Sequence, residues 1–432
     1  MDVFLAQPTF LRMSKLLELP GFEATLVQRG LRGLSVAEQV DGFCRDLADA
    51  GFRAQRFNMP IGTLHPRHGA HSYVWRPDQG LATELHPRRL TGDESEGYLR
   101  SPIHHLRRSG DATLRRRLDG GGSAEFPILA DLRDLGMTDY AAQMVSFSES
   151  PEAEASSGGP FALSGGLNPM QGIFFSCATD AAEGFDDAEL RQVGDLLPYL
   201  ALAVKSRSTF DVARTLLETY LGEDAGERVL TGEIDRHSVQ TIQAVIWFCD
   251  LRGFSRMASR VSQRDLVELL DTYLELMARP VLDNRGQILK FMGDGFLATF
   301  DLAARSREAA CADAVKAARQ LVDRVPAFNA SRRSGGKETL DFGVAIHMGE
   351  VLYGNIGTKE RLDFTVVGSA VNEASRIEGL CRPLGRHVLV SSPVHEAAAM
   401  ANGALQSLGV HALRGILEPQ ELFTIADGSP GR

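Results

Sequence analysis

The stretch from Ala244 to Met257, AVIWFCDLRGFSRM, constrains the fold of this chain more than any other. A run rich in Val, Ile, Trp and Phe predicts a buried central strand, and this one ends in the carboxylate of Asp250. The residues that follow, LRGFS, predict a short turn at Gly253 and then the start of a helix. A carboxylate beside exposed backbone N–H groups is a place to hold a metal ion and the phosphates that it binds.

A second carboxylate, Asp294, follows in LKFMGDGFLATF. Two apolar runs flank Met292–Gly295, which predicts a β-hairpin with its turn at these residues. Taken singly, an aspartate at a strand end is usually structural, as a helix cap or a turn residue. One aspartate at a strand end and another at a hairpin tip together form the arrangement needed to bind two divalent ions.

Three further side chains are candidates for the same site. Lys290 lies an even spacing before Asp294, which on a strand places both on one face, unless the lysine simply extends to the sheet edge. Asn372 and Arg376 are four residues apart in VNEASR and share a face if this segment is helical. A planar arginine suits a phosphoryl group. In isolation, the pair is better explained as a helix cap and a surface charge.

Whole-chain properties limit the class of protein. A length of 432 residues suffices for two or three domains. The net charge of −10 argues against nucleic-acid binding and against a basic membrane-surface patch. Five dispersed cysteines without a CxxC pair indicate a reducing compartment. The N-terminus has no secretory-signal pattern, and the apolar run LLPYLALAV is about half a membrane span, so we expect a cytoplasmic protein without a transmembrane segment.

Residues 1–205 predict an α+β domain. The expected elements are a short helix near Leu11–Leu17, a helix opened by a capping box at Ser35 and Glu38, strands at Phe52–Ile61, Ser72–Trp75 and Gly172–Ala178, a solvated helical face over residues 100–118, and an amphipathic helix over Asp186–Lys205. Residues 1–34 are otherwise expected to be irregular. The low-complexity residues 148–168 predict a flexible loop.

Residues 206–239 predict a helical linker, interrupted by Gly222 and Gly226, that is either a signalling joint or a plain connector. From residue 240 to 432 strands and helices alternate. We expect a helix stopped by Pro280, a hairpin at 287–300, and a second hairpin within DFGVAIHMGEVLYGNIG. Helices packed on a mixed sheet predict an α/β sandwich for this part.

The histidines of the turn TLHPRHGAH suggest either a metal or haem site, or a solvated turn. No second group of ligand residues at a fixed spacing accompanies His65, His68 and His71. A solvated turn is the better interpretation, and the role of this turn stays open.

The segments FCDLRGFS, LKFMGDGFLATF, IHMGEVLYGNIG and RLDFTVVGSAVNEASRIEGL, in this order, resemble the catalytic domain of the class III nucleotide cyclases. The resemblance covers about residues 240–426. It implies that Asp250 and Asp294, with the Leu251 carbonyl, bind two Mg²⁺ or Mn²⁺ ions. It implies that Lys290 and Thr365 contact the base, that Asn372 positions the ribose, and that Arg376 stabilises the transition state.

In this family the base-contacting pair decides the substrate. A lysine donates to a ring acceptor of adenine and a threonine accepts from its amino group, so the resemblance implies ATP. Many members have Asp where this chain has Thr365. The resemblance also implies a homodimer of catalytic domains with shared sites. A guanylate cyclase, a catalytically silent nucleotide-binding module and a scaffold protein are the alternatives.

Residues 1–205 resemble, in their order of elements, the GAF-type sensor modules that are often fused to bacterial cyclases. The resemblance implies a regulatory role and names no ligand. A domain that only dimerises the enzyme would have the same sequence features.

Overall fold

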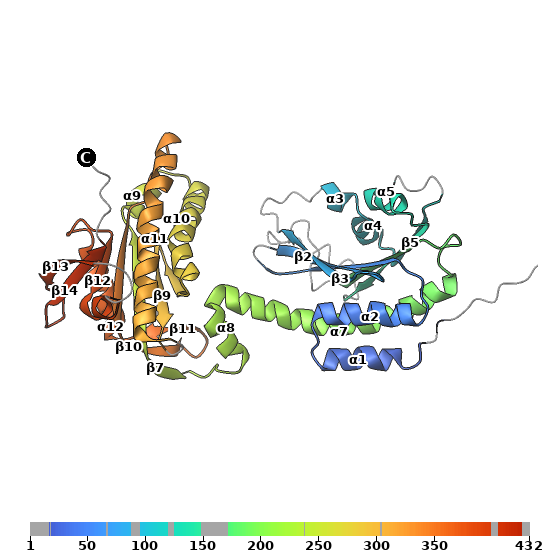
Figure 1. Ribbon diagram of the computed structural model, residues 1–432, viewed down its shortest axis with the longest axis horizontal. Helices are drawn as coiled ribbons and strands as arrows, with labels where there is room; N and C mark the ends of the chain where they lie inside the picture. Colours follow the sequence, from blue (N-terminus) through green and yellow to red (C-terminus); the bar gives the residue numbers. More distant parts are fainter. Residues whose placement is uncertain are drawn as a thin grey trace, which may run out of the picture. The chain divides into compact units, whose positions relative to one another are not determined.

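The computed structural model describes residues 17, 19–65, 68–87, 96–119, 125–147, 172–236, 238–302, 305–398 and 405–425. The chain divides into two compact units, Met1–Leu216 and Leu217–Arg432. Each unit contains one sheet with helices against it (Figure 1).

The N-terminal unit is built on a six-stranded antiparallel sheet in the order β3-β2-β1-β6-β5-β4 (Figure 1). Its strands are β1 (Arg56–Gly62), β2 (His68–Arg76), β3 (Gly80–Pro87), β4 (Thr113–Arg117), β5 (Asp139–Ser146) and β6 (Gly172–Thr179). Its helices are α1 (Phe22–Leu31), α2 (Val36–Asp49), α3 (Glu96–Leu99), α4 (Pro102–Ser109), α5 (Pro127–Asp134) and α7 (Asp187–Leu221), the last of which crosses the boundary between the units.

The two faces of this sheet are covered by different helices, because alternate residues of a strand point to opposite sides. In β6, Phe175 and Cys177 pack with α1, α2 and α7, whereas Phe174 and Ala178 pack with α4 and α5. The α+β organisation predicted from the sequence is therefore confirmed for this unit.

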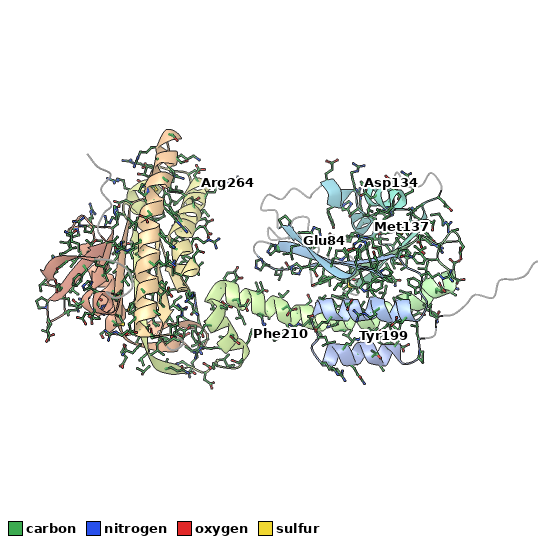
Figure 2. All side chains as sticks on the ribbon, in the orientation of Figure 1. Glu84, Asp134, Met137, Tyr199, Phe210 and Arg264 are labelled. Atoms are coloured by element: carbon green, nitrogen blue, oxygen red, sulfur yellow. The ribbon has the colours of Figure 1, made fainter. Side chains whose placement is uncertain are left out.

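Helix α7 joins the helix predicted over Asp186–Lys205 to the first part of the predicted helical linker, and it stops at Gly222, which adopts φ +89°. Neither glycine nor proline occurs between Lys205 and Gly222, so nothing in the backbone chemistry interrupts the helix. The interruption predicted at Gly226 is wrong, since this residue lies within α8 (Glu223–Leu230). In the side-chain view, Tyr199 and Phe210 mark the part of α7 that lies in this unit, and both rings are exposed (Figure 2).

Several other expectations for this unit need correction. Residues 100–118 are not one helical face, since Gly110 at φ +77° ends α4 and the following arginines form β4 against β5. Helix α1 lies within residues expected to be irregular. The capping box of Ser35 and Glu38 is present, as predicted. The helix expected near Leu11–Leu17 lies outside the described residues except for Leu17, and the loop expected at 148–168 lies wholly outside them.

The C-terminal unit is built on an eight-stranded mixed sheet in the order β13-β14-β12-β10-β7-β9-β8, with β11 paired to β10. Its strands are β7 (Val239–Leu251), β8 (Gln287–Met292), β9 (Gly295–Asp301), β10 (Phe342–Gly357), β11 (Leu362–Val367), β12 (Val388–Ser391), β13 (Leu405–His411) and β14 (Gln420–Ile425). Its helices are α8 (Glu223–Leu230), α9 (Phe254–Ala258), α10 (Gln263–Asp283), α11 (Arg307–Ser334), α12 (Ser369–Leu380) and α13 (Ser392–Ala398).

Helices cover both faces of this sheet. Helices α10, α11 and α13 pack on one face, over Trp247 and Phe300, and α10 and α11 run side by side there (Figure 1). Helix α12 and part of α8 pack on the other face, through Ala225, Ala370 and Ala374. The predicted arrangement of helices on a mixed sheet is thus confirmed.

Two local expectations for this unit are wrong. Pro280 does not stop α10, which continues for three more residues to Asp283. The segment from Phe342 to Gly357 is one 16-residue strand rather than a hairpin. It pairs along its length with β7, so its hairpin partner is β11 instead.

Candidate active site

Asp250 lies at the carboxyl end of the central strand β7, as the sequence predicted. On one side, Asp250 pairs with Gly343 of β10. On the other side, β7 pairs with β9, which forms a hairpin with β8. Residues 244–247 and Cys249 of β7 are buried, whereas Asp250 is half-buried, so its carboxylate lies where the core meets the surface. Its Oδ1 accepts a hydrogen bond of 3.1 Å from the backbone N–H of Leu251.

Asp294 lies in the two-residue turn between β8 and β9, where Gly293 adopts φ +69°. The next residue, Gly295, holds this turn against the end of β7. A Cβ at Gly295 would lie 2.1 Å from the Cys249 carbonyl oxygen and 3.0 Å from the Asp250 Cα, so only glycine fits there. The close approach of two backbones therefore brings Asp294 to Asp250.

The two carboxyl groups influence one another directly. Burial, the charge of Asp294 and a hydrogen bond with Asp294 together raise the pKa of Asp250 to about 6. Two carboxylates that face each other favour a proton or a cation between them. The hard oxygen ligands of this pair are those that Mg²⁺ and Mn²⁺ prefer.

A third carboxylate, that of Glu378 on α12, lies close to this pair and was missed from the sequence. A Cβ at Gly343 would lie 2.1 Å from its Oε1, and Gly343 is the register partner of Asp250. Burial and the charges of Asp250 and Asp294 raise the pKa of Glu378 to about 7, opposed by Arg252. Only the packing of α12 on β7 and β10 shows this proximity, since Glu378 is distant from both aspartates along the chain.

Lys290 and Thr365 come from β8 and β11. The Lys290 Nζ lies 3.7 Å from the Asp363 Oδ2 on β11, and Asp363 and Thr365 are two residues apart on that strand. The expectation that Lys290 and Asp294 share one face of a strand is wrong, because β8 ends at Met292 and Asp294 lies in the turn. Lys290 is instead paired with Asp363 of β11. Thr365 is buried, and its Oγ1 has no hydrogen-bond partner among the described residues.

Asn372 and Arg376 lie one turn apart on α12, in line with the expectation of a helix there. Helix α12 packs through Ala370 and Ala374, which leaves Asn372 exposed and Arg376 half-buried. The Arg376 guanidinium lies against Gly415, where a Cβ would be 2.7 Å from Nη1. Among the described residues, no hydrogen bond or ion pair joins Asn372 or Arg376 to the two aspartates.

The donor set at the end of β7 fits a divalent cation in its chemistry. Asp250 and Asp294 would supply oxygen ligands, and the pKa of Asp250 is raised by burial and then by the charge of Asp294. Within the described residues, no group of three or more histidine, cysteine, aspartate or glutamate side chains is arranged to hold a metal by itself. Such a pair needs substrate phosphates to complete the coordination of an ion.

Residues 237–426 match the family model of the adenylate and guanylate cyclase catalytic domain. This part of the C-terminal unit is thus a nucleotide cyclase catalytic domain by its sequence. Residues 237–426, somewhat less than half of the chain, are thus similar to the catalytic domain of the class III adenylate and guanylate cyclases, as the sequence motifs predicted.

Relatives with names of the same kind match parts of this chain. An adenylate cyclase of Anabaena cylindrica is 33% identical over 165 residues, which are 37% of this chain and 32% of that protein. Adenylate cyclase 1 of Rhizobium meliloti is 27% identical over 223 residues, 50% of this chain and 33% of that protein. The chain spans about a third of the length of these two relatives.

Among solved structures, that of the adenylyl cyclase CyaB from P. aeruginosa aligns with 45% of this chain and 98% of its own, at 24% identity and a TM-score of 0.41. In the parts of this chain that the structure describes, no helix has both the length and the hydropathy needed to cross a bilayer.

Proposed function

We propose that this protein is an adenylate cyclase that converts ATP to 3′,5′-cyclic AMP and pyrophosphate. The observation that supports this most is the pairing of Asp250 with Asp294 at the end of β7, within a domain of the cyclase family. Two carboxylates in contact raise the free energy of the folded protein unless something neutralises them. A metal-bound triphosphate would supply that neutralisation.

Asp250, Asp294 and the Leu251 carbonyl would hold two divalent cations, Mg²⁺ or Mn²⁺. When bound, such ions make the ribose 3′-OH more acidic and neutralise the phosphates. The role of the protein side chains is to position the triphosphate so that the 3′-OH is in line with the α-phosphorus. Arg376 would stabilise the charge that develops on the phosphoryl group, and Asn372 would orient the ribose.

The selection of adenine would rest on Lys290 and Thr365. The Lys290 ammonium donates to a ring nitrogen, and the Thr365 hydroxyl accepts from the exocyclic amine. The unpartnered, buried Thr365 Oγ1 supports this role, because a buried hydroxyl usually has a hydrogen-bond partner and a base would provide one. The contact with Asp363 orients the lysine before a nucleotide arrives.

The catalytic domain would work as a homodimer. Asn372 and Arg376 make no contact with the two aspartates of their own chain, which agrees with a site in which they serve the nucleotide of the partner. A two-fold axis would then create two equivalent sites. We further propose that residues 1–205 form a GAF-like regulatory domain that acts on the catalytic domain at 240–432 through residues 206–239.

The purified chain should cyclise ATP far better than GTP with Mg²⁺ or Mn²⁺. Each buried hydrogen bond mispaired with guanine costs about 1–3 kcal/mol, so we expect a preference of about tenfold to a hundredfold in kcat/KM. The measurement is chromatographic quantification of both cyclic nucleotides over a range of substrate concentrations.

Lys290→Glu should lower kcat/KM for ATP by a similar factor, and Lys316→Glu, which changes an exposed lysine of α11, should not. Equal use of the two nucleotides by the wild type would contradict the adenine assignment. Nucleotide binding without turnover would instead favour a silent binding module.

A further inference from the structure

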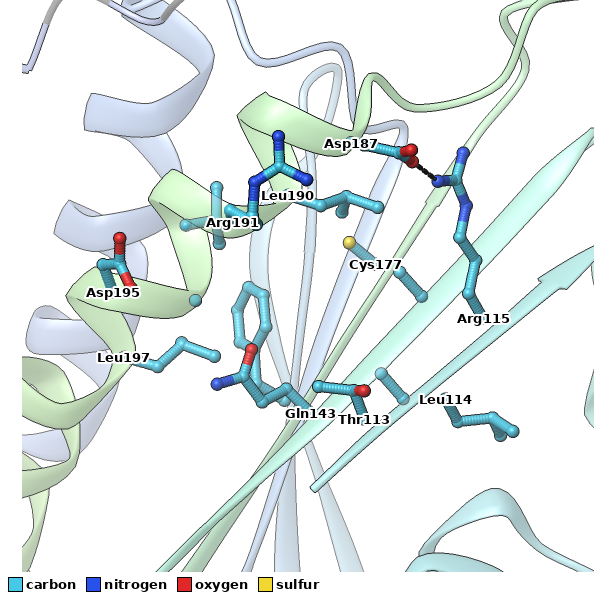
Figure 3. Close-up of a pocket in the computed structure, with 15 residues that line it drawn as sticks. Thr113, Leu114, Arg115, Gln143, Cys177, Asp187, Leu190, Arg191, Asp195 and Leu197 are labelled. Atoms are coloured by element: carbon cyan, nitrogen blue, oxygen red, sulfur yellow. Dashed lines mark hydrogen bonds and ion pairs between the residues drawn. The ribbon is translucent and has the colours of Figure 1, made fainter. Parts of the chain in front are cut away.

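A cavity of about 470 Å³ lies in the N-terminal unit, between α7 and the strands β4, β5 and β6 (Figure 3). It opens on the sheet face that packs with α1, α2 and α7, and the opposite face is filled by α4 and α5. Its volume is within the range of about 300–1,000 Å³ of sites that bind small organic molecules. The residues of the candidate active site all belong to the other unit.

The floor and one wall of the cavity are apolar. Phe175 and Cys177 of β6 are buried at its base, and Leu190 and Leu197 of α7 line its side. Figure 3 shows the Cys177 sulfur, Leu190 and Leu197 around the same space. Burial raises the pKa of the Cys177 thiol well above its usual range, so the floor carries no charge at neutral pH.

The charged groups of the cavity offer no net charge to a ligand. Arg115 donates to Asp139 at 2.7 Å and to the carbonyl of Phe185 at 2.6 Å, and it also contacts Asp187, so its guanidinium is already satisfied. Arg191 and Asp195, one turn apart on α7, are exposed and of opposite sign. A charged ligand would therefore find no surplus of the opposite charge.

One polar group at the cavity has no partner. The Gln143 carboxamide on β5 forms no hydrogen bond with any described residue. It lies against α7 at Gly194, where a Cβ would be 2.8 Å from its Oε1, so the glycine leaves room for the amide (Figure 3). A carboxamide presents a donor and an acceptor side by side and pairs best with a ligand that has the same two groups in a row.

We propose that this cavity is a binding site for an uncharged, flat heteroaromatic molecule with an amide or imide edge. The ring would lie on Phe175 and between the leucines of α7, and its N–H and C=O would pair with Gln143. Helix α7 forms one wall of the cavity and continues to Leu221, which belongs to the C-terminal unit. A bound ligand would therefore change the conformational equilibrium of the helix that leads to that unit.

Lumichrome is a suitable probe, since it is flat, uncharged and fluorescent and has an imide edge. Its 1,3-dimethyl derivative has the same rings without the N–H donors. We expect the full chain to bind one lumichrome saturably and to bind the dimethyl derivative about tenfold more weakly, as the loss of one hydrogen bond implies. Fluorescence titration measures both affinities and does not depend on cyclase activity.

Gln143→Leu should weaken lumichrome about tenfold and abolish the preference over the dimethyl derivative. The matched control is Gln28→Leu, the same change at an exposed position of α1, which should behave as wild type. Ala141→Phe, which fills the cavity, should abolish binding of both probes.

The proposal is overturned if the wild type shows no saturable binding. It is also overturned if Gln143→Leu keeps the wild-type affinity and preference, or if a folded Ala141→Phe still binds. Because Gln143 is only half-buried, the Leu variant should fold, as circular dichroism will verify, and it decides the question even where Ala141→Phe does not fold.

Discussion

The two units differ in how their buried carboxylates are surrounded: one is paired with a cation, and the others lie next to further carboxylates. In the N-terminal unit, Asp139 is fully buried, and Arg115 and the backbone N–H of Phe185 donate to its Oδ2. In the C-terminal unit, Asp250 faces Asp294, and Glu378 adds a third acidic group nearby. The first arrangement stabilises a fold by pairing opposite charges. The second gathers like charges at a strand end, which costs stability and is expected where a bound cation neutralises them.

The contrast explains why the candidate active site is easier to recognise than any site in the N-terminal unit. A charge that is satisfied by its neighbours gives no indication of a ligand. Carboxylates without a cationic partner do, and so does the unpartnered hydroxyl of Thr365. The following experiments test this contrast, beginning with the largest expected effect.

Asp294→Asn should lower cyclic-nucleotide formation at least about a hundredfold, because it removes one of the two carboxylates that would bind the metal ions. The fold should persist, since the turn residue is only half-buried. The assay is turnover of ATP with saturating Mn²⁺, with circular dichroism as the test of folding. Asp271→Asn, at an exposed position of α10, is the matched control. Near-normal turnover by Asp294→Asn would remove the basis for the metal site.

Asp294→Ala and Arg376→Ala should each be inactive and should restore activity to one another when co-expressed. With random pairing, half of the dimers are mixed and each has one intact site of two, so the ceiling is about a quarter of wild-type activity. The measurement is cyclic AMP formation by the co-expressed pair, with sedimentation to verify dimers. A dimeric mixture as inactive as its parents would mean that Arg376 acts within its own chain.

Arg115→Met should destabilise the N-terminal unit by about 3–5 kcal/mol, because it leaves Asp139 buried without its cation. Partial exposure of Arg115 places the expected value at the lower end of this range. Arg133→Met, which removes an exposed partner of Asp134, should change stability by less than about 1 kcal/mol. Chemical unfolding of both variants gives the two values, and equal values would contradict the stabilising role of the Arg115 pair.

Asp250→Asn should raise the Tm of the metal-free protein at pH 7.5. The pKa of Asp250 is raised in the folded state to about 6, so its contribution to stability is full at low pH and is lost as the pH rises through about 6. Because the Asp250 side chain is only partly buried, we expect a rise of only about 2–4 °C.

The same variant should respond differently to pH and to metal. At pH 5 the rise in Tm should shrink, and Mn²⁺ should stabilise the wild type more than Asp250→Asn. Thermal scans at both pH values, with and without Mn²⁺, are the measurement. A lower Tm for the variant at pH 7.5 would show that the carboxylate stabilises the metal-free fold.

Much of the C-terminal unit was predictable because its signals are local. The apolar run that ends in Asp250 formed β7, and the glycines around Asp294 formed the turn, since each needs only neighbouring residues to act. The extent of β10 was not predictable in this way. A glycine within a strand pattern suggests a turn, but at Gly349 pairing with β7 continues past it.

In the N-terminal unit, the arginine-rich residues 113–117 illustrate the same limit. Their local pattern fits a solvated helix, yet they form β4 because β5 offers a hydrogen-bonding edge and Asp139 a partner. Neither β5 nor Asp139 is close in sequence, so no local pattern could predict the outcome.

The sequence by itself indicated the cyclase-type catalytic domain, the strand end and the turn that carry the two aspartates, and the helix that carries Asn372 and Arg376, because these depend on motifs whose order and chemistry are visible along the chain. Only the tertiary structure decided that Glu378 joins the aspartates, that Thr365 is buried without a partner, and that a cavity with the Gln143 amide lies beside α7. The physical reason is distance along the chain. Burial, charge coupling and cavities arise where segments far apart in sequence pack together, and each of these three features lies at such a contact.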